Sequence, residues 1–171
     1  DVPTAGRVVF GETELSALTA ERRAAVRLRE FGMVFQEHNL IPEFTACDNV
    51  MLPLEAVGTD EKSARRAAEA AMERVGIGEL HGRFPAELSG GQRQRVGIAR
   101  ATVGGRTVLF ADEATGALDR ANTMVVFALF RALADQGYAV LAATHDAAGS
   151  QLADRTVHME DGAISTVDVR A

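Results

Sequence analysis

Three short apolar runs constrain the fold of this chain more than any other feature of its sequence. They lie at residues 31–35, 107–111 and 139–143, and stretches with helical spacing of apolar residues separate them. Short runs that are apolar throughout are typical of strands buried on both faces, and strands that alternate with helices favour a parallel sheet covered by helices. We therefore predict an α/β fold built on a largely parallel sheet.

The remaining sequence pattern agrees with this class of fold. Helices are expected at 21–29, 61–75, 93–101 and 122–135, and a hairpin with its turn at Asp161-Gly162 is expected over 156–167. The chain has 171 residues, of which 47% are hydrophobic, so one domain with a real core is expected. No apolar run approaches the roughly 20 residues that a membrane-spanning helix needs.

Charge and cysteine content exclude several classes of function. The net charge of -6 argues against general binding to nucleic acid. We interpret Arg93, Arg95 and Arg100 as a solvated or salt-bridged helix face. The single cysteine, Cys47, excludes an internal disulfide and suits a reducing compartment.

Polar residues follow each of the three apolar runs. Gln36 follows the first, Asp112 and Glu113 the second, and His145 comes two positions after the third. In open α/β sheets, ligands bind at the carboxyl ends of the strands. Each of these residues has an ordinary structural explanation when it is taken alone. Their arrival at one sheet edge favours a functional site.

The carboxylate pair suits phosphoryl transfer. Two adjacent side chains at a strand end point in opposite directions, so one can hold Mg²⁺ while the other positions or deprotonates a water. We assign Asp112 to the metal and Glu113 to the water. Gln36 would complete the metal or water shell without adding charge, and His145 would donate to a γ-phosphate or to Glu113. The other histidines, at positions 38, 81 and 158, have no matching partners in the sequence, and we assign them no role.

Residues 88–92, Leu-Ser-Gly-Gly-Gln, have the form of an anion-binding helix start. Gly90 and Gly91 leave backbone N–H groups uncovered where the helix dipole favours an anion, and the hydroxyl of Ser89 adds a donor. Further along, residues 115–119 form a tight turn that ends in Asp119, which could cap the next helix.

Together these residues resemble the ATPases of the ATP-binding-cassette (ABC) family over nearly the whole chain. Residues 88–92 are similar to its signature loop, Gln36 to its Q-loop glutamine, 108–113 to its Walker B strand, 116–119 to its D-loop and His145 to its switch histidine. Residues 35–42 and 49–54 resemble the branch that powers lipoprotein release, macrolide export and cell-division complexes.

The resemblance implies a P-loop NTPase-like parallel sheet core with an inserted helical signature subdomain. It implies that residues 1–42 form part of the nucleotide-binding core, that residues 43–103 form the helical subdomain, and that residues 104–171 form the rest of the core. The implied ligands are ATP and Mg²⁺, with Glu113, His145 and Gln36 catalytic and with Asp112 and Gln36 at the metal. The implied ATP-binding residues are Ser89, Gly90, Gly91, Gln92 and Asp119. The implied partners are a second ATPase subunit and transmembrane permease subunits, with no nucleic acid, at the cytoplasmic face of the membrane.

One family motif is missing from the sequence. The phosphate loop G-x-x-x-x-G-K-[ST] needs a lysine after a glycine, and the only lysine, Lys62, follows Glu61. We therefore expect an incomplete core, a fragment of a transporter ATPase that is inactive alone and exposes a sheet edge. The alternative is a non-catalytic partner that supplies only a signature half-site. DNA-repair ATPases are disfavoured, since no sustained heptads separate Gln36 from Leu88.

Overall fold

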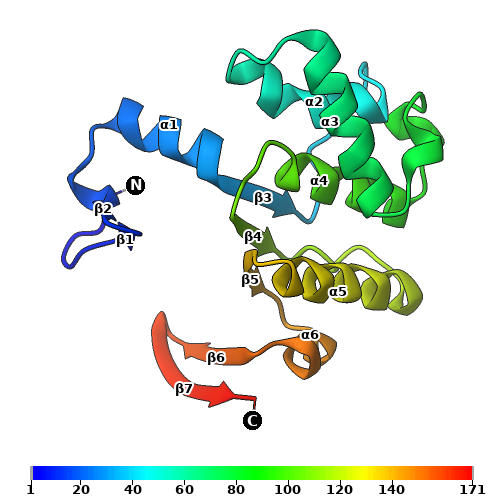
Figure 1. Ribbon diagram of the computed structural model, residues 1–171. Helices are drawn as coiled ribbons and strands as arrows, with labels where there is room; N and C mark the ends of the chain where they lie inside the picture. Colours follow the sequence, from blue (N-terminus) through cyan, green and yellow to red (C-terminus); the bar gives the residue numbers. More distant parts are fainter. Residues whose placement is uncertain (1, 171) are drawn as a thin grey trace.

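The computed structural model describes residues 2–170 and has a three-stranded parallel sheet at its centre (Figure 1). The strands are β3 (Phe31–Phe35), β4 (Val108–Asp112) and β5 (Ala139–Ala143), in the spatial order β3-β4-β5. The prediction of a parallel sheet is confirmed. Among the described residues β3 and β5 pair only with β4, so both outer edges of this sheet are unpaired.

Two helices cover one face of the sheet. α4 (Gly90–Thr102) packs on β3, and α5 (Arg120–Asp135) packs on β5 and touches α4. Gly32 explains why α4 can lie so close, because a Cβ at this position would stand 2.0 Å from the carbonyl oxygen of Ala101. The glycine within this apolar strand is therefore required for contact between the strand and the helix backbone.

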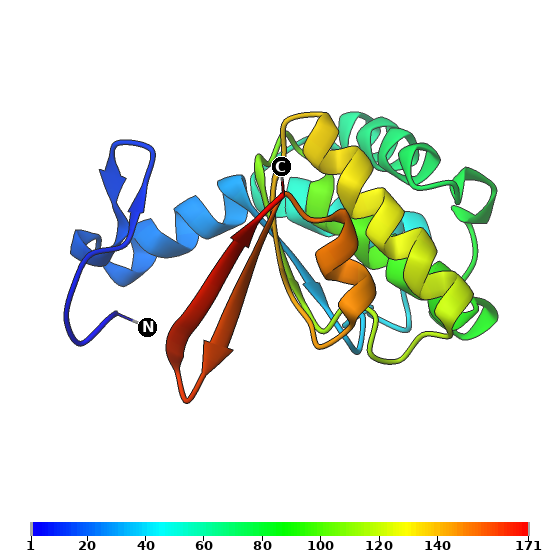
Figure 2. The same cartoon turned by 90° about the horizontal axis from the view of Figure 1, so that it is seen from below.

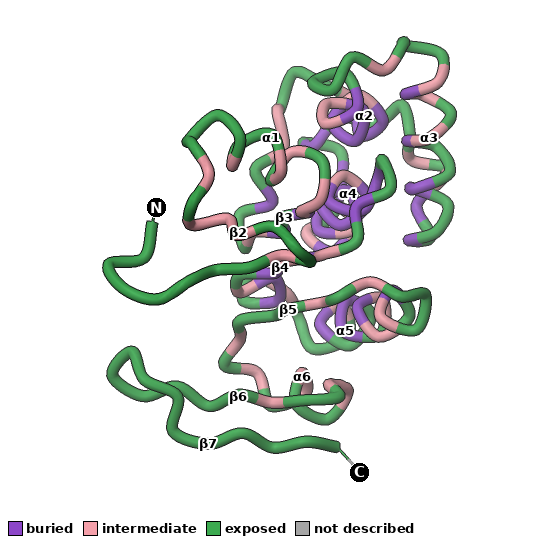
Figure 3. The backbone as a smooth tube through the Cα atoms, turned by 60° about the vertical axis from the view of Figure 1, so that its left-hand side comes forward, coloured by how far each residue is buried: buried purple, intermediate pink, exposed green. Residues whose placement is uncertain are grey.

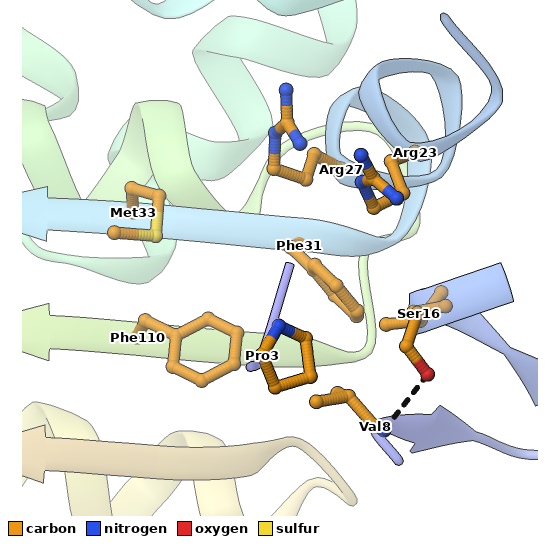
Figure 4. A pocket seen from close by; sticks show the side chains of 9 residues that line it. Pro3, Val8, Ser16, Arg23, Arg27, Phe31, Met33 and Phe110 are labelled. Carbon is orange, nitrogen blue, oxygen red and sulfur yellow. Dashed lines mark hydrogen bonds between the residues drawn. The ribbon is translucent and has the colours of Figure 1, made fainter. Parts of the chain in front are cut away.

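The opposite face of the sheet is open. Met33 and Leu141 are 42% and 55% exposed, whereas Leu109 on the covered face is fully buried. Phe31 and Phe110 meet edge to face on the open side with ring centroids 5.6 Å apart. Figure 4 shows these rings beside a shallow apolar pocket of about 260 Å³, which also has two arginines of the preceding helix in its lining. The sheet therefore buries one face only.

A helical region lies beyond α4 and holds much of the core. It contains α2 (Ala46–Ala56), α3 (Glu61–Arg74) and two short 3-10 turns, η2 (Gly78–Leu80) and η3 (Pro85–Glu87). α2 begins at a capping box in which Thr45 and Asp48 satisfy each other's backbone N–H groups. Figure 3 shows that the buried backbone gathers in these helices, in α4 and α5, and in the strands beneath them.

The first and last strands of the described chain lie outside this packed region, the N-terminal pair to its left in Figure 2 and the C-terminal pair below it in Figure 1. At the start, β1 (Val9–Phe10), β2 (Thr13–Glu14) and η1 (Leu15–Ala17) lead into α1 (Ala20–Glu30), which buries no residue. At the other end, α6 (Ala147–Leu152) precedes the predicted hairpin, formed by β6 (Arg155–Glu160) and β7 (Ala163–Val169). The hairpin forms a sheet of its own.

Most predicted elements form within a few residues of their expected bounds. The helix expected at 93–101 instead begins at Gly90, because Ser89 caps it. Within residues 2–170 no helix has the length and apolar character needed to cross a membrane.

Candidate functional site

The register of the sheet brings the predicted strand-end residues to one edge. Phe35 pairs with Asp112, and Asp112 pairs with Ala143, so the three strands end in the same row. Gln36 and Glu113 follow this row directly, with His145 two positions after β5. These residues therefore lie at one edge of the sheet, as expected.

Glu113 has an unusual backbone conformation. Its φ is 46°, in the left-handed region that a residue with a long side chain seldom occupies. Such a conformation costs about 1–3 kcal/mol and persists where the surroundings fix it, often at functional sites. The N–H of Glu113 donates to the carbonyl of Ala143 at 2.9 Å, which fixes the residue against the end of β5.

Glu113 and His145 form a close pair at this edge. The Nδ1 of His145 lies 2.9 Å from the Oε2 of Glu113. The two atoms are within ion-pair distance, and apart from this contact the buried Oε2 has no partner among residues 2–170. Glu113 raises the pKa of His145 above its ordinary value. The pair thus joins the ends of β4 and β5.

Gln36 lies over the turn that follows Glu113. A Cβ added to Gly116 would stand 3.1 Å from the Nε2 of Gln36 and 3.4 Å from the carbonyl oxygen of Glu113. The N–H of Gly116 donates to that same carbonyl at 3.0 Å, which closes the turn. We call Gln36, Glu113 and His145 the sheet-edge cluster.

The signature residues form the N-terminus of α4. The hydroxyl of Ser89 accepts from the N–H of Gln92 at 3.2 Å, and the side chain of Gln92 accepts from the N–H of Ser89 at 2.8 Å. This reciprocal cap leaves the N–H groups of Gly90 and Gly91 without a partner among the described residues. The uncovered N–H groups expected at this helix start are therefore present, and anion binding there stays a prediction.

The start of α5 lies directly against the signature residues. A Cβ on Gly91 would stand 2.2 Å from the Oδ1 of Asn122, whereas one on Gly90 would make ordinary contact with Leu118 at 3.7 Å. Asp119 caps α5 as expected, accepting from the N–H of Asn122 at 2.9 Å and from its Nδ2 at 2.7 Å. These bonds lower the pKa of Asp119. We call residues 89–92 with Asn122 the helix-start cluster.

The arginines of α4 differ from the prediction. We expected a solvated or salt-bridged face, but among the described residues none of the three forms an ion pair. Arg93 donates to the carbonyl of Leu88 at 2.6 Å and Arg95 to that of Gly76 at 3.1 Å. Arg100 donates to two carbonyls of the segment after Gln36. The reason is that nearby loop carbonyls lack helix or strand partners, and the arginines supply them.

Sequence reasoning also missed His38. This histidine is 9% exposed, and its Nδ1 contacts the Oε1 of Gln94, a residue of α4 that is fully buried. Burial is the main cause that lowers the pKa of His38. Its partner lies 56 positions away, so no local pattern could have revealed the pair.

An open parallel sheet with polar residues at the carboxyl ends of its strands is typical of α/β domains that bind nucleotides. The chain matches the ABC transporter family profile over residues 1–116. It is 40% identical to "Lipoprotein-releasing system ATP-binding protein LolD" of Shewanella sp. (strain MR-4), with 98% of this chain and 73% of that protein covered. It is 42% identical to "Macrolide export ATP-binding/permease protein MacB" of Syntrophobacter fumaroxidans, with 96% of this chain and 23% of that protein covered.

Solved structures give the same assignment. The dimeric structure of the bacterial ABC transporter cassette MJ0796 superposes with a TM-score of 0.87 at 30% identity, covering 99% of this chain and 75% of that one. A post-hydrolysis state of that cassette, bound to ADP and Pi, superposes equally well. The chain belongs to the ABC transporter family, and it is an ATPase domain of that family. The expected resemblance to the lipoprotein-release and macrolide-export branch is confirmed.

Proposed function

We propose that this chain works in an ATPase dimer in which its two clusters serve two different nucleotides. The helix-start cluster would contact the γ-phosphate of an ATP held by the partner subunit, through Ser89 and the N–H groups of Gly90 and Gly91. The sheet-edge cluster would act on the ATP on its own side. The observation that carries this proposal is the pair of N–H groups of Gly90 and Gly91, which have no partner among residues 2–170.

The sheet-edge cluster would supply the chemistry of hydrolysis. Glu113 would accept a proton from the attacking water or orient it, and its position just after β4, with a side chain that is 34% exposed, supports this role. His145 would hold that carboxylate and donate to the γ-phosphate, since it is exposed and more easily protonated than an ordinary histidine. Gln36, which follows the neighbouring strand β3, would help to position this water.

The residues present also fit Mg²⁺. Among residues 2–170 no group of three or more His, Cys, Asp or Glu side chains converges on one point. Mg²⁺ suits such a sparse set, because it takes one or two protein oxygens and completes its shell with phosphates and water. Asp112, which ends β4 with an exposed side chain, and the side-chain oxygen of Gln36 would hold it. The bound ion would neutralise charge on the β- and γ-phosphates.

The partners we propose are a second ATPase subunit and transmembrane permease subunits, at the cytoplasmic face of the membrane. The relatives support this, since they are named as ATP-binding components of a lipoprotein-releasing system and of a macrolide exporter, and the solved cassette is dimeric. The carboxylate of Asp119 caps α5. The turn that ends in Asp119 would bring this residue near the nucleotide held by the partner subunit.

A second candidate function rests on the missing lysine loop. Lys62 lies at the start of α3, and no lysine of these 171 residues stands in a phosphate loop. A subunit that supplied only the helix-start cluster would still serve the ATP of its partner. In that case Glu113 would have no ATP to act on.

One experiment separates the two functions. The native assembly is purified through a tag on this chain, and phosphate release from Mg-ATP is measured for the wild type, Glu113→Gln and Ser89→Ala. We expect Glu113→Gln to slow turnover by at least about 100-fold while ATP binding is kept. Slower turnover in Ser89→Ala with unchanged turnover in Glu113→Gln would favour the second candidate function, in which this chain supplies only the helix-start cluster. Turnover unchanged by either variant would contradict both functions.

A further inference from the structure

The segment that carries Gln36 is bound to the signature helix by side chains of that helix. Gln94, in the second turn of α4, donates through Nε2 to the carbonyl of Phe35 at 3.5 Å, and its Oε1 contacts the Nδ1 of His38. Gln94 is fully buried, so both ends of its amide are used inside the protein.

Arg100 holds the other side of the same segment. Its two terminal nitrogens donate to successive carbonyls, Nη2 to His38 and Nη1 to Asn39, each at 2.6 Å. A planar guanidinium suits two neighbouring acceptors, because its donors form a rigid fork. Burial lowers the pKa of Arg100, with the nearby Arg106 as the second cause.

The backbone of this segment is bent in a way that needs such support. His38 and Asn39 have φ of 62° and 47°, so two successive residues lie in the left-handed region. Asparagine tolerates this conformation, but histidine adopts it less readily. The bend directs both carbonyls at Arg100. The contacts and the bend therefore depend on each other.

α4 connects these contacts to the helix-start cluster and to the sheet. The helix begins at the signature residues, carries Gln94 and Arg100 along its length, and meets β3 where Ala101 lies against Gly32. Gln36 lies in sequence between Phe35 and His38, whose carbonyls accept hydrogen bonds from Gln94 and Arg100. Its backbone position is therefore set by α4.

We propose that Gln94 and Arg100 are positioning residues that tie the Gln36 segment to the signature helix. Gln36 keeps its place over the turn at Gly116 only while this tie is intact, and a displacement of the segment carries the helix-start cluster with it. The inference rests on the proposed function, because it assumes that Gln36 acts in hydrolysis.

The test compares Arg100→Lys with Arg131→Lys. Lysine keeps the charge but cannot supply the fork, and the guanidinium of Arg131, on α5, donates to Asp135 and Asp154, away from the segment and from both clusters. In the native assembly we expect Arg100→Lys to lower kcat about tenfold, with KM for ATP changed less than about twofold. Arg131→Lys should leave both constants near those of the wild type.

Hydrogen exchange gives a readout that does not depend on ATP. The N–H groups of His38 and Asn39 donate within the bend, to Phe35 and Glu37. In Arg100→Lys we expect them to exchange about tenfold faster, with exchange in α2 unchanged. Should Arg100→Lys fail to fold, Gln94→Met, which removes the other tie at similar volume, takes its place with the same expected results.

The outcomes separate the two proposals. Unchanged exchange at His38 and Asn39 contradicts the tie. Faster exchange with unchanged kcat contradicts its role in positioning Gln36, and a fall in kcat matched by an equal rise in KM does the same. A wild-type assembly that hydrolyses no ATP contradicts the proposed function, while the exchange measurement on the chain still decides whether the tie exists.

Discussion

The Nδ1 of His145 lies 2.9 Å from the Oε2 of Glu113, across the ends of two neighbouring parallel strands. This contact couples the protonation of the histidine to folding, because it is absent in the unfolded chain. The pair also joins the residue expected to orient water to the one expected to contact the γ-phosphate. Its pH dependence can be measured without ATP.

We predict that the stabilisation by His145 is lost at alkaline pH. The contact raises the pKa of His145 in the folded state, so its contribution is complete below the ordinary histidine value, about 6.5, and disappears as the pH rises through the raised value. The difference in Tm between wild type and His145→Gln should therefore be larger at about pH 6 than at about pH 8.5. In a Glu113→Gln background this pH dependence should become much smaller, because only the weaker effect of Asp146 remains, and its persistence at full size would rule out the pair as its main source.

The space around the two signature glycines differs, and this gives a matched pair of variants. Gly91→Ala would displace the side chain of Asn122 and break the bond from its Nδ2 to Asp119, whereas Gly90→Ala makes only ordinary contact with Leu118. We expect Gly91→Ala to be about 1–2 kcal/mol less stable than Gly90→Ala, the scale of a lost hydrogen bond with some overpacking. Urea unfolding measures both. Equal stability would show that Asn122 moves aside freely.

The contact between β3 and α4 leaves no room for a side chain. Gly32→Ala would place a Cβ 2.0 Å from the backbone oxygen of Ala101, which cannot rotate away. We expect a loss of about 3 kcal/mol or more, at the upper end of overpacking costs. Gly82→Ala is the control, because no atom of residues 2–170 lies within 4 Å of its added Cβ. A small and equal effect of the two substitutions would contradict this packing.

The isolated chain should bind ATP weakly. No lysine loop occurs in these 171 residues, so no backbone cradle and lysine charge hold the β- and γ-phosphates within the chain. Calorimetry should give no dissociation constant tighter than about 1 mM. A micromolar value would mean that other residues of this chain form a complete phosphate site.

Local patterns were enough to predict the sheet and its functional edge. The bounds of β3 and β5 agree with the apolar runs, and a polar residue that follows a parallel strand must lie at the carboxyl edge. The ties from α4 could not be predicted, because Arg100 and the carbonyls it contacts are about 60 positions apart in sequence. The left-handed backbone of Glu113 was also unforeseen, since it depends on the bond to Ala143 in a distant strand.

The most direct test of the composite site is photolabelling with an ATP analogue that carries its reactive group on the γ-phosphate. We predict that the assembled ATPase dimer is labelled on this chain within residues 88–92, at Ser89 or its neighbours, and that the same chain as a monomer is not labelled there. Labelling of these residues in the monomer would contradict the proposal that the signature helix contacts the partner's nucleotide. The absence of labelling at these residues in a dimer that binds the analogue would contradict it equally.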